Sequence, residues 1–134
     1  MSDGRARILV ADNDEDILTL VAFRLERTGY EVLVARDGAE ALARAREELP
    51  DLCVLDVMMP ELTGYDVTQR LRSDPRTSAI PVILLTARVQ EADVDRGFDA
   101  GADAYVRKPF SPQELRDRVA AALEARGART RRAG

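Results

Sequence analysis

The sequence predicts an α/β protein in which a parallel sheet is covered by helices on both faces. Short apolar runs alternate along the chain with longer segments whose apolar residues recur at helical spacing. Each run is continuously apolar instead of alternating with polar residues, so each strand is expected to be buried on both faces, as in a parallel sheet. The predicted strands lie at residues 8–11, 32–35, 52–55, 82–85 and 104–106.

Five segments with helical patterns follow these strands, at residues 16–29, 38–50, 63–74, 91–101 and 111–127. In the first segment Ile17, Leu20, Val21 and Leu25 have the spacing of one helix face. Gly29 predicts the end of this helix, because glycine readily adopts the left-handed conformation found after helix ends. The resulting pattern is βαβαβαβαβα, for which right-handed crossovers leave few topologies.

Capping residues support the helix boundaries. Thr63 and Asp66 stand at the spacing of a capping box, and Ser111 and Glu114 have the same spacing around a proline in the first turn. Pro50 is expected to end the second helix.

The composition describes one globular domain and excludes several classes of protein. Hydrophobic residues make up 46% of the chain and charged residues 33%, which is typical of a folded domain. No apolar run approaches the roughly 20 residues of a membrane span, and the first residues lack the apolar stretch of a signal peptide. The chain has no His, and its single Cys53 excludes an internal disulfide and is expected in the core. The net charge of −4 argues against nucleic-acid binding by this domain.

Polar residues occur where the predicted strands end. Asp12 and Asn13 follow the first strand, Asp56 follows the third, Thr86 the fourth and Lys108 the fifth. Each residue alone is commonly a turn or cap residue. Ligands of open α/β sheets bind at the carboxyl ends of the strands, so the convergence of four such ends predicts a binding site.

The residue types at these ends favour phosphoryl chemistry on an aspartate. Carboxylates without His or a thiolate cluster suit a hard cation, above all Mg²⁺. A hydroxyl and an ammonium would bind the remaining phosphate oxygens, and a carboxylate can itself be the nucleophile. Lys108 is the only lysine among 20 basic residues, which suggests a position where the wider guanidinium of arginine does not serve.

The chain resembles the receiver domain of two-component response regulators, in the CheY-like superfamily. The resemblance covers residues 5–125 and rests, in this order, on ILVADNDEDI, PDLCVLDVMMPELTGYD, IPVILLTA, GADAY and KPFSPQEL. It implies a flavodoxin-like (βα)₅ fold, doubly wound, with five parallel strands in the order 2-1-3-4-5. We expect a receiver domain at residues 1–126, and at residues 127–134 a flexible Arg-rich tail or the start of a linker.

The resemblance also implies roles for the strand-end residues. Asp56 would be the phosphoacceptor, receiving a phosphoryl group from a histidine kinase or a histidine phosphotransfer protein. Lys108 would pair with the phosphate, with a cis peptide bond before Pro109. Thr86 would bond the phosphoryl group, and Tyr105 would be the aromatic residue coupled to it in the conformational switch.

Magnesium is the implied cofactor. Its ligands would be Asp12, Asn13, Asp56 and the backbone carbonyl of Met58. The family usually carries an acid at the position of Asn13, and counting along the first helix keeps Asn13, not Asp14, in that position. An amide oxygen coordinates without full charge, so Mg²⁺ binding is expected to weaken by about 1–2 kcal/mol, roughly tenfold. That Asn13 is a tolerated substitution without regulatory meaning is an equal alternative.

The chain lacks the motifs that three other functions would require. A haloacid dehalogenase-type phosphatase needs an acid two residues after its nucleophile, where this chain has Met58. A dinucleotide enzyme needs glycines after the first strand, and a flavin binder a Ser/Thr-rich loop there; the chain has neither. The remaining alternative is a pseudo-receiver, an interaction module that works without phosphorylation, which only Asn13 favours.

We therefore expect a cytoplasmic phosphorelay protein and not an enzyme, apart from self-phosphorylation and self-dephosphorylation at Asp56. It would control an output domain or a downstream protein, without itself binding nucleic acid or a membrane. The segment 91–126 resembles a dimerisation face whose charged positions match Asp99, Asp103 and Arg118. Val94 and Ala104 replace the usual Arg and Asp, so a monomer or weak dimer is expected.

Overall fold

The computed structural model describes residues 5–87, 95–96 and 98–133. Its strands are β1 (Arg7–Ala11), β2 (Glu31–Ala35), β3 (Leu52–Asp56), β4 (Val82–Thr86) and β5 (Ala104–Arg107). They form one parallel sheet in the order β2-β1-β3-β4-β5. This confirms the predicted fold class and strand order, and each predicted strand differs from the observed one by at most one residue at either end.

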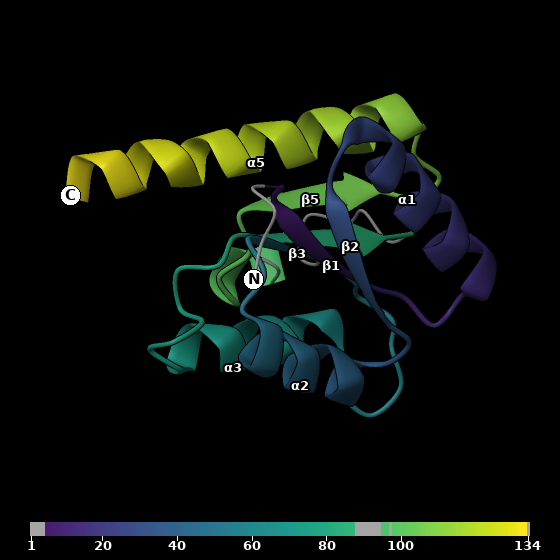
Figure 1. Cartoon of the computed structure of the whole chain (residues 1–134). Helices are drawn as coiled ribbons and strands as arrows, with labels where there is room; N and C mark the ends of the chain where they lie inside the picture. Colours follow the sequence, from purple (N-terminus) through teal and green to yellow (C-terminus); the bar gives the residue numbers. More distant parts are fainter. Residues whose placement is uncertain (1–4, 88–94, 97, 134) are drawn as a thin grey trace.

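The helices are α1 (Glu15–Thr28), α2 (Gly38–Glu48), α3 (Gly64–Ser73) and α5 (Pro112–Ala133). Figure 1 shows α1 and α5 on one face of the sheet and α2 and α3 on the other. Of the helix expected at residues 91–101, residues 91–94 and 97 lie outside the described part, and residues 95, 96, 98 and 99 are helical. The sheet is therefore covered on both faces, as predicted.

Two hydrophobic clusters hold the layers together, one on each face. Successive residues of the central strands point to opposite faces, so Leu9 and Cys53 belong to the cluster under α2 and α3. Val10 and Val54 belong to the cluster under α1 and α5. The strands β1, β3 and β4 are almost entirely buried, whereas the edge strands β2 and β5 are less so. Cys53 is a fully buried thiol, as expected.

Most of the predicted helix ends are observed. Gly29 follows α1 with a φ of 110°, in the left-handed conformation. Thr63 and Asp66 form the expected capping box at the start of α3, and the Ser111 hydroxyl accepts a hydrogen bond from the backbone N–H of Glu114. Helix α2 ends earlier than predicted, because Leu49 already leaves the helix; proline disfavours the helical conformation for the residue before it.

Helix α5 runs to Ala133 without a break at residue 126. A flexible tail or the start of a linker was expected from residue 127. Alanine and arginine favour helix, and no proline interrupts this segment. The Arg126 guanidinium also connects α5 to the residue before β3 by donating a 2.8 Å hydrogen bond to the backbone carbonyl of Asp51. The domain boundary after residue 126 stays a prediction.

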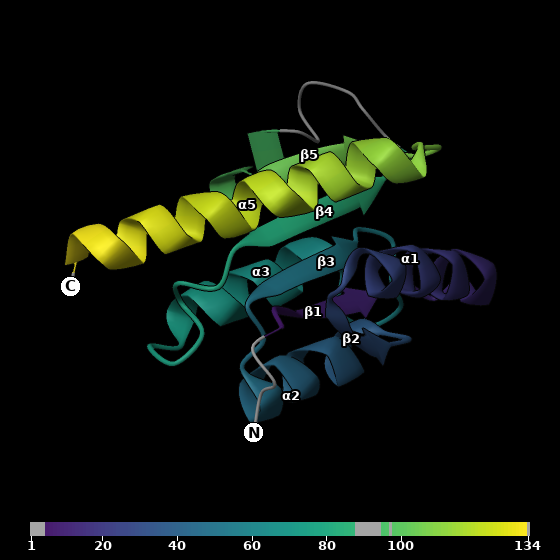
Figure 2. The same cartoon turned by 45° about the horizontal axis from the view of Figure 1, so that its top comes forward.

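Helix α5 crosses the sheet beside α1, as Figure 2 shows, and leucine and valine side chains of both helices share one cluster. No helix in the described part of the chain is both long and apolar enough to span a membrane.

Candidate functional site

Three strand ends bring two carboxylates and an ammonium together. Asp12 follows β1, Asp56 is the last residue of β3, and Lys108 follows β5. The Lys108 Nζ lies 2.8 Å from Asp12 Oδ2 and 3.2 Å from Asp56 Oδ1. Asp12 is fully buried and Asp56 is 4% exposed. The ammonium therefore bridges two carboxylates that are almost out of contact with solvent.

The local backbone fixes the Asp12 side chain. Its second carboxylate oxygen, Oδ1, accepts a 2.9 Å hydrogen bond from the backbone N–H of Asp14. The backbone N–H of Asp12 continues the pairing with β2 by donating to Ala35. Both oxygens of this carboxylate thus have partners, one in the turn before α1 and one on Lys108.

The site perturbs the ionisation of its members. Burial raises the pKa of Asp56, and the neighbouring Asp12 charge raises it further; Lys108 and the backbone N–H of Met58 oppose this by hydrogen bonding to the carboxylate. Burial alone would lower the pKa of Lys108, but the hydrogen bond to Asp12 and the charges of both aspartates outweigh it and raise that pKa. The ammonium is consequently charged at neutral pH, and its charge favours the ionised form of Asp56 against the opposing effects of burial and of the Asp12 charge.

The side chains of Asp14 and Asn13 have different surroundings. The Asp14 carboxylate caps α1 by accepting hydrogen bonds from the backbone N–H groups of Asp16 and Ile17. Its Oδ1 atom is therefore engaged at the start of the helix, and the assignment of Asn13 in place of Asp14 as a metal ligand stays a prediction. The Asn13 side chain is exposed at the same edge of the sheet, as is Met58 in the loop after β3.

Thr86 and Tyr105 lie on the strands next to the site. Thr86 ends β4 and is buried, and its backbone carbonyl accepts a 2.7 Å hydrogen bond from the backbone N–H of Lys108. The Lys108–Pro109 peptide bond is cis, as the resemblance implied. The half-buried Tyr105 of β5 shares a 3.0 Å hydrogen bond between hydroxyls with Tyr65 of α3. No local sequence pattern marks Tyr65 as a functional residue, because this contact joins residues 40 positions apart.

The loop after β3 is held against the strand end. The backbone N–H of Gly64 donates to the Val57 carbonyl at 3.0 Å. A Cβ atom at Gly64 would lie only 2.7 Å from the backbone carbonyl of Asp56, so glycine is required where α3 begins. This close approach packs the first turn of α3 directly on the residue that carries the buried carboxylate.

The donor set suits a hard cation and a phosphoryl group. Within the described residues, no cluster of three or more His, Cys, Asp or Glu side chains could hold a metal ion by itself. Two carboxylates with one ammonium leave one excess negative charge, and Mg²⁺ is commonly held by one or two carboxylates with oxygen donors from water and phosphate. The residues present fit such an ion better than a fully protein-ligated metal.

Known proteins share this fold and these sequence motifs. The family model of the response regulator receiver domain matches residues 8–120. The transcriptional regulator PhoP of Bacillus subtilis is 49% identical over 117 residues, which are 87% of this chain and 48% of PhoP. The DNA-binding regulator RpaA of Synechocystis is also 49% identical over 117 residues, with the same shares of each chain. The chain thus spans about half the length of these curated relatives.

Solved structures of receiver domains have the same fold as this chain. The CheY-like receiver domain protein of Methanospirillum hungatei has a TM-score of 0.89 and 28% identity, covering 94% of this chain and 99% of that one. The receiver domain of the sensor histidine kinase PA1611 of Pseudomonas aeruginosa, with a magnesium ion coordinated in its active site cleft, has a TM-score of 0.84 and 27% identity, covering 90% and 99%. The chain belongs to the response regulator receiver domain family of two-component signal transduction.

Proposed function

We propose that Asp56 is the phosphoacceptor of this receiver domain. The observation that carries the proposal is the Asp56 carboxylate at the end of β3, buried and held by the Lys108 ammonium beside a second buried carboxylate. A carboxylate so placed is oriented by fixed partners and protected from water. These are conditions under which a carboxylate serves as a nucleophile.

The proposed reaction starts from a phosphohistidine of a kinase or phosphotransfer protein. An Asp56 carboxylate oxygen attacks phosphorus, the new O–P bond forms, and the P–N bond breaks with its electron pair passing to the imidazole. Lys108, which holds Asp56 at 3.2 Å before transfer, would then pair with a phosphoryl oxygen. Hydrolysis of the acyl phosphate returns Asp56 to a carboxylate. Self-phosphorylation and self-dephosphorylation are in this proposal the only chemistry of the domain.

Asp12 and Asp56 are the carboxylates that would hold Mg²⁺, with the Asn13 amide oxygen and the Met58 carbonyl as further ligands. The bound ion would neutralise charge on the transferred phosphoryl oxygens. The excess negative charge of the site supports this assignment, as does the magnesium ion in the related PA1611 receiver domain.

Thr86 and Tyr105 are the proposed switch residues. Thr86 ends the strand next to Asp56, and its backbone carbonyl bonds the backbone N–H of Lys108, so Thr86 lies at the same edge of the sheet as the proposed phosphoacceptor. Tyr105 lies three residues before Lys108 on the adjacent strand. A shift of Thr86 toward the phosphoryl group would change the packing around Tyr105.

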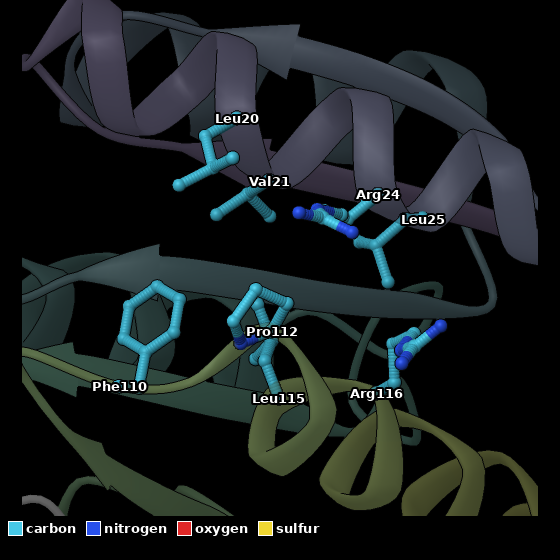
Figure 3. A pocket seen from close by; sticks show the side chains of 8 residues that line it. All are labelled: Leu20, Val21, Arg24, Leu25, Phe110, Pro112, Leu115 and Arg116. Carbon is cyan, nitrogen blue, oxygen red and sulfur yellow. The ribbon is translucent and has the colours of Figure 1, made fainter.

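The phosphodonor is proposed to dock on α1 and the start of α5. A small groove between these helices is lined by Leu20, Val21, Arg24, Leu25, Phe110, Pro112, Leu115 and Arg116, as Figure 3 shows. Leu20 and the nearby Phe23 are 47% and 53% exposed. Phe110 stands two residues after Lys108, so a partner helix seated here could present its histidine to Asp56. Leu20→Asp should slow transfer from a phosphorylated kinase domain while leaving labelling by acetyl phosphate unchanged; equal transfer rates would refute this surface.

The whole protein is proposed to act in the cytoplasm, with a DNA-binding output domain following α5. The support is that PhoP and RpaA are transcriptional regulators about twice as long as the matched segment. The pseudo-receiver alternative, which only Asn13 favours, gains no support from these relatives.

A gel that retards phosphoproteins tests the central proposal. The protein is incubated with acetyl phosphate and Mg²⁺, alongside Asp56→Asn and the control variant Asp51→Asn, which changes an aspartate remote from the site. Retardation of the wild type and the control but not of Asp56→Asn is expected. Equal retardation of all three, or of none, would contradict it.

A further inference from the structure

Tyr65 is a buried tyrosine whose hydroxyl pairs with that of Tyr105. The two hydroxyl oxygens are 3.0 Å apart, and Tyr65 is only 5% exposed in the cluster under α2 and α3. A buried tyrosine hydroxyl is costly unless it has a hydrogen-bond partner. The pair therefore fixes Tyr105 of β5 relative to the first turn of α3.

Tyr65 is also connected, through the adjacent Gly64, to the end of β3, which carries the proposed phosphoacceptor Asp56. Tyr65 directly follows Gly64, whose N–H bonds the Val57 carbonyl and which packs too closely on the Asp56 carbonyl to admit a Cβ. Tyr65 is thus connected to the backbone of Asp56 and Val57 through the contacts of its neighbour Gly64. This route does not pass through Thr86.

A third residue holds the Tyr65 ring. The guanidinium carbon of Arg96 lies 4.6 Å from the ring centroid, within the range of a cation–π contact. Residue 96 is helical, so the ring lies between α3 and a residue outside that helix. The ring is held independently of its hydroxyl, and removing the hydroxyl alone should leave the ring in place.

We propose that Tyr65 is a positioning residue of the switch: its hydroxyl holds Tyr105 in the arrangement that accompanies unmodified Asp56. The inference rests on the proposed phosphorylation of Asp56. In the observed structure the hydroxyl pair coexists with the Lys108–Asp56 ion pair, which a phosphoryl group would disrupt. In this proposal the hydroxyl pair belongs to the unphosphorylated arrangement and opposes the transition to the phosphorylated one.

Tyr65→Phe should make that transition easier. A net hydrogen bond of ordinary strength corresponds to a factor of about 2 to 12 in an equilibrium constant. By thermodynamic linkage, a group bound at Asp56 must bind more tightly to the variant by about the same factor. Beryllofluoride with Mg²⁺, which mimics an aspartyl phosphate by binding the carboxylate reversibly, allows this to be measured at equilibrium.

The experiment is a double-variant cycle with beryllofluoride as the ligand and ¹⁹F NMR of the bound form as the readout. Wild type, Tyr65→Phe, Tyr105→Phe and the double variant are titrated at fixed Mg²⁺. Tyr30→Phe is the control, because it removes the one other tyrosine hydroxyl of the chain, at the junction of α1 and β2. Each single variant at the pair is expected to bind several-fold more tightly, and the double variant no more tightly than either single variant.

Two results would overturn the inference. One is a dissociation constant for Tyr65→Phe equal to that of the wild type and of Tyr30→Phe, even if its melting temperature falls, which would leave the hydroxyl a purely structural role. The other is a double variant whose gain is the product of the single gains, which would show that the hydroxyls act independently. A wild-type protein that binds no beryllofluoride would instead contradict the proposed function itself.

Discussion

The Nζ of Lys108 lies 3.2 Å from Oδ1 of Asp56 and joins the end of β5 to the end of β3. The same nitrogen is 2.8 Å from Asp12, so one compact cation serves two buried carboxylates. The space between three strand ends suits an ammonium on a slender side chain. A guanidinium is planar and wider, and cannot occupy the same point.

Lys108→Arg should therefore impair phosphorylation although the charge is kept. We expect labelling by acetyl phosphate to slow by about tenfold or more, equivalent to a loss of about 1.4 kcal/mol. Rates are measured at saturating Mg²⁺ with Arg107→Lys as control, because this exchange affects an exposed neighbour. Equal rates for Lys108→Arg and wild type would show that charge alone suffices.

Asn13→Asp should tighten Mg²⁺ binding by roughly tenfold, if residue 13 is a direct ligand, because a full charge replaces an amide dipole. Phosphorylation at limiting Mg²⁺ should quicken accordingly, and the two proteins should converge at saturating Mg²⁺. The titration is followed with a fluorescent probe, since the chain has no Trp. Thr19→Asp adds the same charge on the exposed side of α1 and should have little effect. Superimposable curves for Asn13→Asp and wild type would mean that residue 13 does not contact the metal.

Cys53 predicts a pH dependence of stability. Burial raises the pKa of its thiol from 9.0 to about 12, against the smaller opposing charges of Arg72 and Arg126. Above pH 9 the unfolded chain loses this proton and the native chain keeps it, so the free energy of unfolding falls as the pH rises toward 12.

Between pH 8 and pH 10, this thiol should lower the free energy of unfolding by about 1.4 kcal/mol. Urea denaturation of wild type and Cys53→Ala at both pH values isolates the contribution, because the other titrating groups are common to both proteins. The loss between the two pH values should be larger in the wild type. An identical loss in both would mean that the native thiol ionises normally.

One residue of the expected dimerisation face, Asp103, already makes hydrogen bonds within the chain. The Asp103 carboxylate accepts hydrogen bonds from the Arg72 guanidinium at 2.9 Å and from the backbone N–H of Val82 at 2.8 Å. These contacts tie the start of β5 to α3 and β4. An intermolecular partner of Asp103 would have to compete with them.

The protein is therefore expected to stay a monomer or a weak dimer when beryllofluoride and Mg²⁺ are added. Asp99 and Arg118 are exposed at this face, Ala104 offers no charge, and Val94 lies outside the described residues. Sedimentation velocity over a range of concentrations measures this. A tight dimer that forms only with beryllofluoride, and that Arg118→Ala disrupts, would contradict the expectation.

Much of the fold could be predicted because its determinants are local. Continuous apolar runs, the capping box at Thr63 and the glycine after α1 each act within a few residues. The convergence of Asp12, Asp56 and Lys108 follows from the topology, since parallel strands place their carboxyl ends at one edge. The Tyr65–Tyr105 contact could not be predicted in this way, because it depends on how α3 packs against β5. Nor does the apolar pattern mark the end of α5, where alanine and arginine continue the helix by intrinsic propensity.

The most direct test of Asp56 as the phosphoacceptor is to identify the residue that becomes phosphorylated. The protein is labelled with acetyl phosphate and Mg²⁺, reduced with borohydride, which converts an acyl phosphate of aspartate to homoserine, and analysed by peptide mass spectrometry. Homoserine is expected at position 56 and at no other position, and its formation should depend on both the phosphodonor and Mg²⁺. Homoserine at another aspartate, or an unmodified Asp56 in protein that has been labelled, would contradict it.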